Sequence, residues 1–131
     1  MSKSSTRALV RSALDHLGVE CQEVSIYFVT SEAIGKLHDQ FFQNPASTDC
    51  ISFPLDKDHL GEVFVCPQVA KEYAEKKNRN PYEETSLYIV HGLLHLIGYD
   101  DLEAKARRSM RKKEKNCMRH LYEHKQMLSP K

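Results

Sequence analysis

Two histidines and an aspartate in the C-terminal half are the residues best suited to chemistry in this sequence. His91 and His95 are four residues apart, so a helix over 85–97 would place both imidazoles on one face. Gly98 predicts the end of that helix, because glycine adopts the left-handed conformation without a Cβ clash. The chain can then turn back and bring Asp101 to the same point. The pattern H-x3-H-x2-G-x2-D therefore predicts two nitrogen ligands and one oxygen ligand for a single metal ion.

This ligand set is typical of a catalytic zinc site rather than a structural one. Three protein ligands leave the fourth position of a tetrahedral ion open. The alternative is that the two histidines are ordinary polar residues of a helix. They interrupt an almost continuous apolar run, however, and burying two imidazoles without a partner is costly. The run consists of Leu87, Tyr88, Ile89, Val90, Leu93, Leu94, Leu96 and Ile97. Nickel and other divalent ions accept the same ligands, so the residue types leave the metal open.

The spacing also matches the long zinc-protease motif H-E-x-x-H-x-x-G-x-x-H, with two differences. The protease's glutamate, the general base of peptide hydrolysis, is Gly92 here, which argues strongly against a protease. The third ligand is Asp101 rather than histidine, which is chemically tolerable because carboxylate oxygen and imidazole nitrogen bind zinc at similar distances. No catalytic residue beyond a metal-bound water can be assigned from the sequence.

Length and composition predict one domain, residues 1–131, with a substantial core. Hydrophobic residues make up 40% of the chain and charged residues 28%, which is ordinary for a globular protein. No apolar run is long enough to cross a bilayer, and the polar N-terminus does not resemble a signal peptide. The four cysteines are widely spaced without a C-x-x-C pair. They predict reduced thiols in a cytoplasmic protein without a membrane partner.

Charge is unevenly distributed along the chain. Residues 12–64 carry 9 acidic and 2 basic groups, whereas residues 102–131 carry 10 basic and 3 acidic groups. This asymmetry indicates a polyanionic partner for the basic end, and the alternative is a solvated helix face. Lys3, Arg7 and Arg11 form a second basic row at a spacing of four.

Periodicity predicts an α/β (α+β) fold, in which a small mixed sheet of three to four strands packs with about five helices. The metal site would lie on a buried helix and the turn that follows it. Apolar spacing predicts helices over 3–17, 31–42, 67–78, 85–97 and 102–124. Runs of β-branched and aromatic residues predict strands over 24–29, 50–53 and 61–65, the last two as antiparallel neighbours.

A second H-x3-H pair, His120 and His124, is predicted to be ordinary surface residues. It lies among charged residues near the C-terminus, without a third ligand in register or an apolar shell. His16, His38 and His59 are isolated in the sequence and predict no site.

Three segments of the chain resemble a known family. The stretch from His91 to Asp101, H-G-L-L-H-L-I-G-Y-D-D, is similar to the H-G-x-L-H-L-x-G-Y-D-H signature of the YbeY endoribonucleases. Thr48–Pro54, T-D-C-I-S-F-P, is similar to that family's T-D-V-L-S-F-P segment, and Gly61-Glu-Val resembles its G-D-I strand start. The order and separation of the segments also fit.

The resemblance implies a mixed α/β domain that holds one zinc ion through His91, His95 and Asp101. It implies a single-strand-specific endoribonuclease that matures ribosomal RNA, notably the 3′ end of small-subunit rRNA, and acts in ribosome quality control. Ribosomal RNA and the small ribosomal subunit would be its partners. The resemblance does not predict an oligomeric state.

Three features depart from the family pattern. Asp101 replaces a histidine, and this anionic ligand should make a bound water somewhat less acidic. Phe42 stands where the family has an arginine, which would hold the scissile phosphate and stabilise its developing charge. The chain also begins with a helix where the family has a strand.

The alternative function is therefore a ribosome-associated RNA-binding factor with weak or lost catalysis. A zinc hydrolase of another substrate is a third possibility, disfavoured by the basic C-terminal segment.

Overall fold

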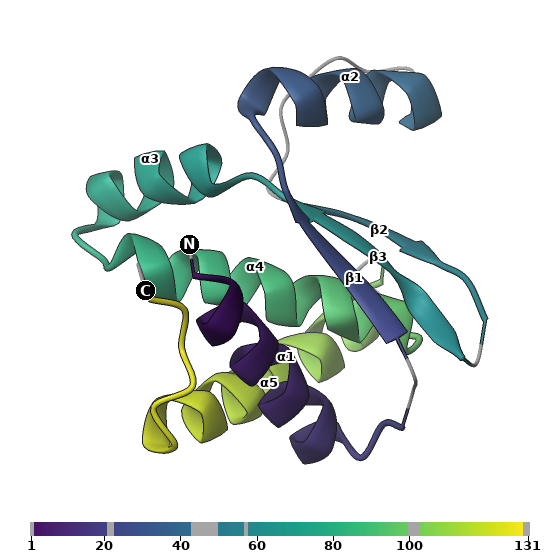
Figure 1. Ribbon diagram of the computed structural model, residues 1–131, viewed down its shortest axis with the longest axis vertical. Coiled ribbons are helices and arrows are strands. Elements are labelled where there is room, and N and C mark those ends of the chain that lie inside the picture. The colour runs from purple at the N-terminus through teal and green to yellow at the C-terminus, as the bar shows by residue number, and fades with distance from the viewer. Residues whose placement is uncertain (1, 21–22, 43–49, 57, 100–102, 130–131) are drawn as a thin grey trace.

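The fold is seen in a computed structural model that describes residues 2–20, 23–42, 50–56, 58–99 and 103–129, leaving aside the side chains of residues 41 and 42. The elements within these ranges are five helices and three strands (Figure 1). In chain order they are α1 (Lys3–Leu17), β1 (Glu23–Phe28), α2 (Ser31–Phe42), β2 (Cys50–Pro54), β3 (His59–Val65), α3 (Pro67–Lys77), α4 (Pro81–Leu96) and α5 (Ala104–Glu123). The predicted α/β fold is therefore confirmed.

The sheet is mixed, with the strand order β1-β3-β2. The central strand β3 pairs in parallel with β1 and antiparallel with β2, so the predicted antiparallel pairing is confirmed. Strand β2 extends one residue further than expected, because Pro54 still pairs in register with Gly61. A proline without an N–H is tolerated here because β2 is an edge strand within the described sheet.

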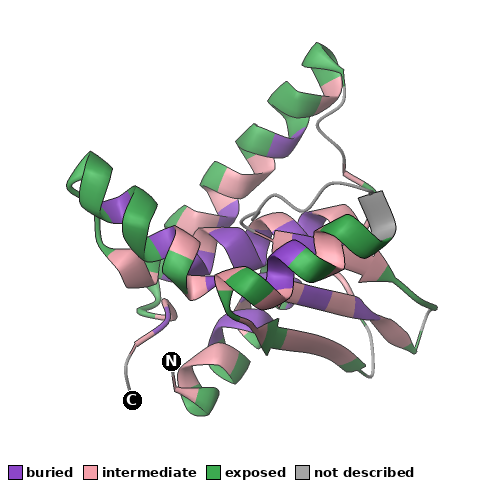
Figure 2. Ribbon diagram, turned by 90° about the horizontal axis from the view of Figure 1, so that it is seen from above, coloured by how far each residue is buried: buried purple, intermediate pink, exposed green. Residues whose placement is uncertain are grey.

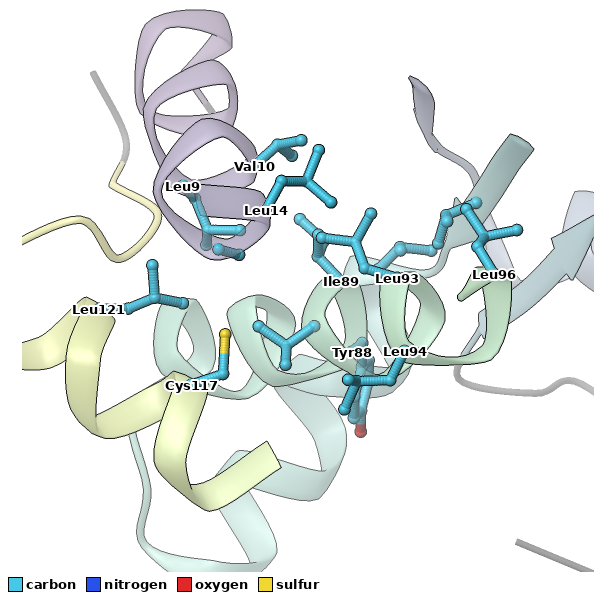
Figure 3. Close-up of a cluster of buried hydrophobic side chains, with 14 of the residues drawn as sticks. Leu9, Val10, Leu14, Tyr88, Ile89, Leu93, Leu94, Leu96, Cys117 and Leu121 are labelled. Atoms are coloured by element: carbon cyan, nitrogen blue, oxygen red, sulfur yellow. The ribbon is translucent and has the colours of Figure 1, made fainter. Parts of the chain in front are cut away.

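Helix α4 is the centre of the molecule. One side of it packs on the sheet, where Val63 and Val65 are fully buried. The opposite side packs against α1 and α5, and Figure 3 shows Leu9 and Leu14 of α1 and Leu121 of α5 gathered around it. Burial is therefore concentrated along the inner faces of these layers, with exposed residues on the outer faces (Figure 2).

The start of α4 is determined by its cap. The Asn80 side chain accepts hydrogen bonds from the N–H groups of Tyr82 and Glu83, at 2.7 and 3.3 Å. Pro81 occupies the first helical position, where its missing N–H costs nothing. The helix consequently begins four residues before the start predicted from the sequence, residue 85. Within the described residues, no helix is both long and apolar enough to cross a membrane.

Gly92 allows α4 to approach the sheet closely. A Cβ atom at this position would lie 2.5 Å from Val63 Cγ1 and 3.1 Å from Ser52 Oγ. The Ser52 hydroxyl also donates a hydrogen bond of 3.2 Å to the Gly92 carbonyl. The residue that replaces the protease's glutamate is therefore one at which any side chain would displace the Val63 side chain of β3.

Replacing Gly92 with alanine should lower the free energy of unfolding by about 1–3 kcal/mol, because the added methyl group overpacks the contact with Val63. Helix propensity alone predicts the opposite, a gain of about 1 kcal/mol. Urea denaturation of the two proteins measures the difference.

The matched control places the same substitution in a Val63→Ala background. There the clashing methyl group is absent, so Gly92→Ala should cost less than in the wild-type background. A Gly92→Ala protein as stable as the wild type would contradict the close-contact explanation.

Candidate metal centre

His91 and His95 lie on one face of α4, one turn apart. Both side chains are partly exposed, whereas Val90, Leu93 and Leu94 beside them are fully buried. Their Nε2 atoms are 3.1 Å apart, and their rings meet edge to face with centroids 4.7 Å apart. The helix therefore brings the two nitrogens together at the edge of the core, as their spacing predicts.

This geometry suits two ligands of one small cation. Zinc–imidazole bonds of about 2.0–2.1 Å with tetrahedral angles place two ligand nitrogens about 3.3 Å apart. The observed separation of 3.1 Å is close to that value, and imidazole nitrogen is a preferred zinc donor. The Nε2 atoms of His91 and His95 are thus spaced as two ligands of the predicted zinc ion would be.

The predicted third ligand, Asp101, lies outside the described residues, as does its neighbour Asp100. Among the residues that are described, no group of three or more His, Cys, Asp or Glu side chains is arranged to hold a metal ion. The ligand set of His91, His95 and Asp101 therefore stays a prediction.

The chain leaves α4 in the way expected from Gly98. This glycine has a φ of 106°, which other residues rarely adopt. Its N–H donates to the carbonyl of His95 at 3.2 Å, and the N–H of Tyr99 donates to that of Leu94 at 3.0 Å. These bonds close the last turn of the helix and redirect the chain directly after the second histidine.

A carboxylate from another helix completes the surroundings of His91. Glu114 of α5 forms a hydrogen bond through Oε2 with His91 Nδ1, the ring nitrogen that does not face His95. Only 15% of the Glu114 side chain and 26% of the His91 side chain are exposed. Sequence reasoning missed Glu114 as a residue of the site.

A signal for Glu114 was nevertheless present in the sequence. Met110, Cys117 and Leu121 are buried on the face of α5 that packs on the core. Position 114 falls on this same face, four residues after Met110 and three before Cys117. A carboxylate in an apolar stripe requires a polar partner on the facing element, and His91 is that partner.

The basic residues fall on two separate surfaces. The exposed cationic side chains of α5 are Lys105, Arg107, Arg108, Arg111, Lys112, Lys115 and Arg119. Arg111 and Lys115 line a groove of about 540 Å³ together with Glu114 and residues of α4, including Glu83 and Glu84. Lys3, Arg7 and Arg11 instead line a groove of about 920 Å³ between α1 and β1. Among the described residues, neither groove is lined by His91 or His95.

Comparison with known proteins identifies the family. The sequence profile described as Endoribonuclease YbeY matches residues 1–122. The chain belongs to the YbeY family. The family predicted from the histidine signature is thus confirmed, and with it the predicted enzyme class, an endoribonuclease.

Individual YbeY relatives and a solved structure agree with this placement. The chain is 51% identical to Endoribonuclease YbeY of Protochlamydia amoebophila, over 87% of this chain and 80% of the relative. It is 40% identical to Endoribonuclease YbeY of Chlamydia pneumoniae, over 87% and 78% of the two chains. The solution structure of TM1509 from Thermotoga maritima is similar with a TM-score of 0.69 and 29% identity, covering 93% of this chain and 81% of that one.

A second cluster of histidines involves none of the residues that carry the YbeY signature. His120 of α5 stacks on His16 of α1, with ring centroids 4.6 Å apart, and its centroid is 4.2 Å from that of His124. The hydroxyl of Ser12 is 3.0 Å from His120 Nε2. His16, isolated in the sequence, is thus a neighbour of the H-x3-H pair in the fold. This cluster joins α1 to α5.

The environment of His120 should make stability depend on pH. Burial and the neighbouring rings of His124 and His16 lower the pKa of His120, against the opposing influence of Glu123 and Asp15. The unfolded chain, with a histidine pKa near 6.5, then binds a proton more readily than the folded protein. The stabilising contribution is present above this pH and decreases as the pH falls through it.

Replacing His120 with glutamine should therefore reduce the loss of stability between about pH 7 and pH 5. Glutamine can keep a hydrogen bond to Ser12 but does not titrate. Thermal unfolding of both proteins across this range measures the effect, and identical pH profiles for the two would contradict it.

Proposed function

We propose that this chain, as one domain over residues 1–131, is a zinc-dependent, single-strand-specific endoribonuclease of ribosomal RNA. One Zn²⁺ would be held by His91, His95 and Asp101. Its role would be maturation of the 3′ end of small-subunit rRNA and ribosome quality control in the cytoplasm. The observation that supports this most strongly is the pair of Nε2 atoms 3.1 Å apart, within the segment that carries the family signature.

The residues of α4 hold the two histidines in position for the proposed metal. His91 and His95 are held on one helix whose other faces are buried, so their rings keep a defined orientation. When bound, the ion would polarise a phosphate oxygen of the RNA or lower the pKa of a water molecule. Gly92 lies between the two histidines and carries no carboxylate, which agrees with a phosphodiester rather than a peptide bond as substrate.

Cationic residues beside Glu114 would attract the RNA backbone. Arg111 and Lys115 flank Glu114 on α5, and Glu114 contacts His91. Phosphate groups bound by these side chains would therefore lie beside Glu114, which links this groove to His91. Because such binding releases counterions, it should weaken steeply with salt concentration.

The direct test is metal-dependent cleavage of a single-stranded rRNA fragment by the purified protein and its His95→Ala variant. The variant should lose bound zinc and cleavage together, because one imidazole and a carboxylate do not replace the three ligands. Metal content by elemental analysis and cleavage by gel electrophoresis provide the two measurements.

The matched control is His124→Ala, from the second H-x3-H pair. It should retain both zinc and activity, since His124 is exposed and distant in sequence from the signature. A His95→Ala protein that cleaves without metal would refute the proposal.

Position 42 distinguishes the enzyme from the alternative of an RNA-binding factor with weak or lost catalysis. The side chain of Phe42 lies outside the described residues, so this test is based on the sequence alone. A Phe42→Arg variant of a weak enzyme should cleave faster, because the guanidinium stabilises charge on the phosphate. RNA binding without cleavage in both proteins would favour the binding factor.

Replacing both Arg111 and Lys115 with glutamine should weaken RNA binding and reduce its salt dependence. Each lost phosphate contact with a single strand lowers the slope of log K against log salt by about 0.7. Binding measured by fluorescence anisotropy at several salt concentrations tests this. Lys71→Gln, an exposed lysine of α3, is the control and should leave the slope unchanged.

A further inference from the structure

The contact between Glu114 and His91 is unusual in its location. The carboxylate stands on the core-facing side of α5, between Met110 and Cys117, two residues that are 1% and 0% exposed. Placing a charged group there is unfavourable unless a hydrogen-bond donor compensates for the lost water. The ring of His91 supplies that donor across the α4–α5 interface.

The chemistry of the pair determines which nitrogen carries the proton. An ionised carboxylate can only accept hydrogen bonds, so the Nδ1 atom of His91 must be the donor. In a neutral imidazole with a proton on Nδ1, the lone pair is on Nε2. That is the atom 3.1 Å from Nε2 of His95.

In this conformation Glu114 does not face the point between the two Nε2 atoms, so it is not placed to be a metal ligand. Its Oε2 contacts Nδ1, whereas the two Nε2 atoms meet at the other edge of the His91 ring. Glu114 would therefore affect a bound metal indirectly, through its hydrogen bond to His91, and not as a ligand next to His91.

We propose that Glu114 is the positioning residue of this site, which holds His91 in the tautomer and orientation that directs Nε2 toward the metal. A carboxylate on the remote nitrogen also makes the imidazole a stronger donor. The role toward the metal rests on the proposed function. The effect of Glu114 on the His91 tautomer does not, because it operates in the metal-free protein. Removing such a carboxylate partner typically weakens metal binding by about 10–100-fold.

The test compares the wild type with Glu114→Gln and with Glu123→Gln. Glutamine preserves the size of the side chain and removes its charge, and its amide can either accept or donate. Glu123 is an exposed glutamate of the same helix, so its variant controls for the loss of one negative charge.

The first readout is the tautomer of His91 in the metal-free protein, from long-range ¹⁵N–¹H NMR correlations above pH 7.5. The wild type and Glu123→Gln should show the proton on Nδ1 alone. Glu114→Gln should show a mixture with the Nε2–H form, because glutamine no longer requires a donor. A wild-type His91 protonated on Nε2, or an unchanged tautomer in Glu114→Gln, would overturn the proposal.

The second readout is zinc affinity, measured by competition with a chromophoric chelator. Glu114→Gln should bind zinc about 10–100-fold more weakly, and Glu123→Gln should match the wild type. A folded Glu114→Gln protein with reduced thermal stability but unchanged affinity would mean a merely structural role and would overturn the proposal. Failure of the wild type itself to bind zinc would refute the proposed function, and the tautomer measurement would still test the contact.

Discussion

The close packing of α4 on the sheet is the constraint on which the rest of this structure depends. At Gly92 the helix backbone approaches Val63 and Ser52 so closely that a Cβ atom would not fit. This contact sets the depth of α4 in the molecule, and the histidines lie on either side of it in the sequence. Because α1 and α5 pack on the opposite side of the same helix, a displaced α4 would disturb every layer.

The candidate centre is shared between two helices, and each contributes a different property. Helix α4 provides the spacing that brings His91 and His95 together. Helix α5 provides Glu114, which determines how one of these rings is oriented and protonated. A site on one helix alone would leave the imidazoles free to rotate about their side-chain bonds, whereas the interhelical hydrogen bond restricts His91. The packing of α5, through Met110 and Cys117, therefore has a consequence for the chemistry of the site.

The fold places the basic residues of α1 and of α5 at different grooves. The basic residues of α5 include two that line the groove beside Glu114, whereas the basic row of α1 lines a different groove. Of the two grooves, the first includes Glu114, the residue of α5 that contacts His91. A polyanionic substrate attracted by α5 would thus meet the groove beside Glu114, whereas the α1 row would contact a different part of it.

The sequence by itself determined the helices and strands, the helical pair of His91 and His95, the turn at Gly98 and the membership of the YbeY family. All of these depend on periodicity, capping residues or short motifs, which are properties of residues close together in the chain. Only the tertiary structure decided that Glu114 contacts His91, that His16 stacks on His120 and that Gly92 faces Val63. Such contacts join residues on different elements, and a periodic pattern shows which face of a helix is buried but not which side chain it meets.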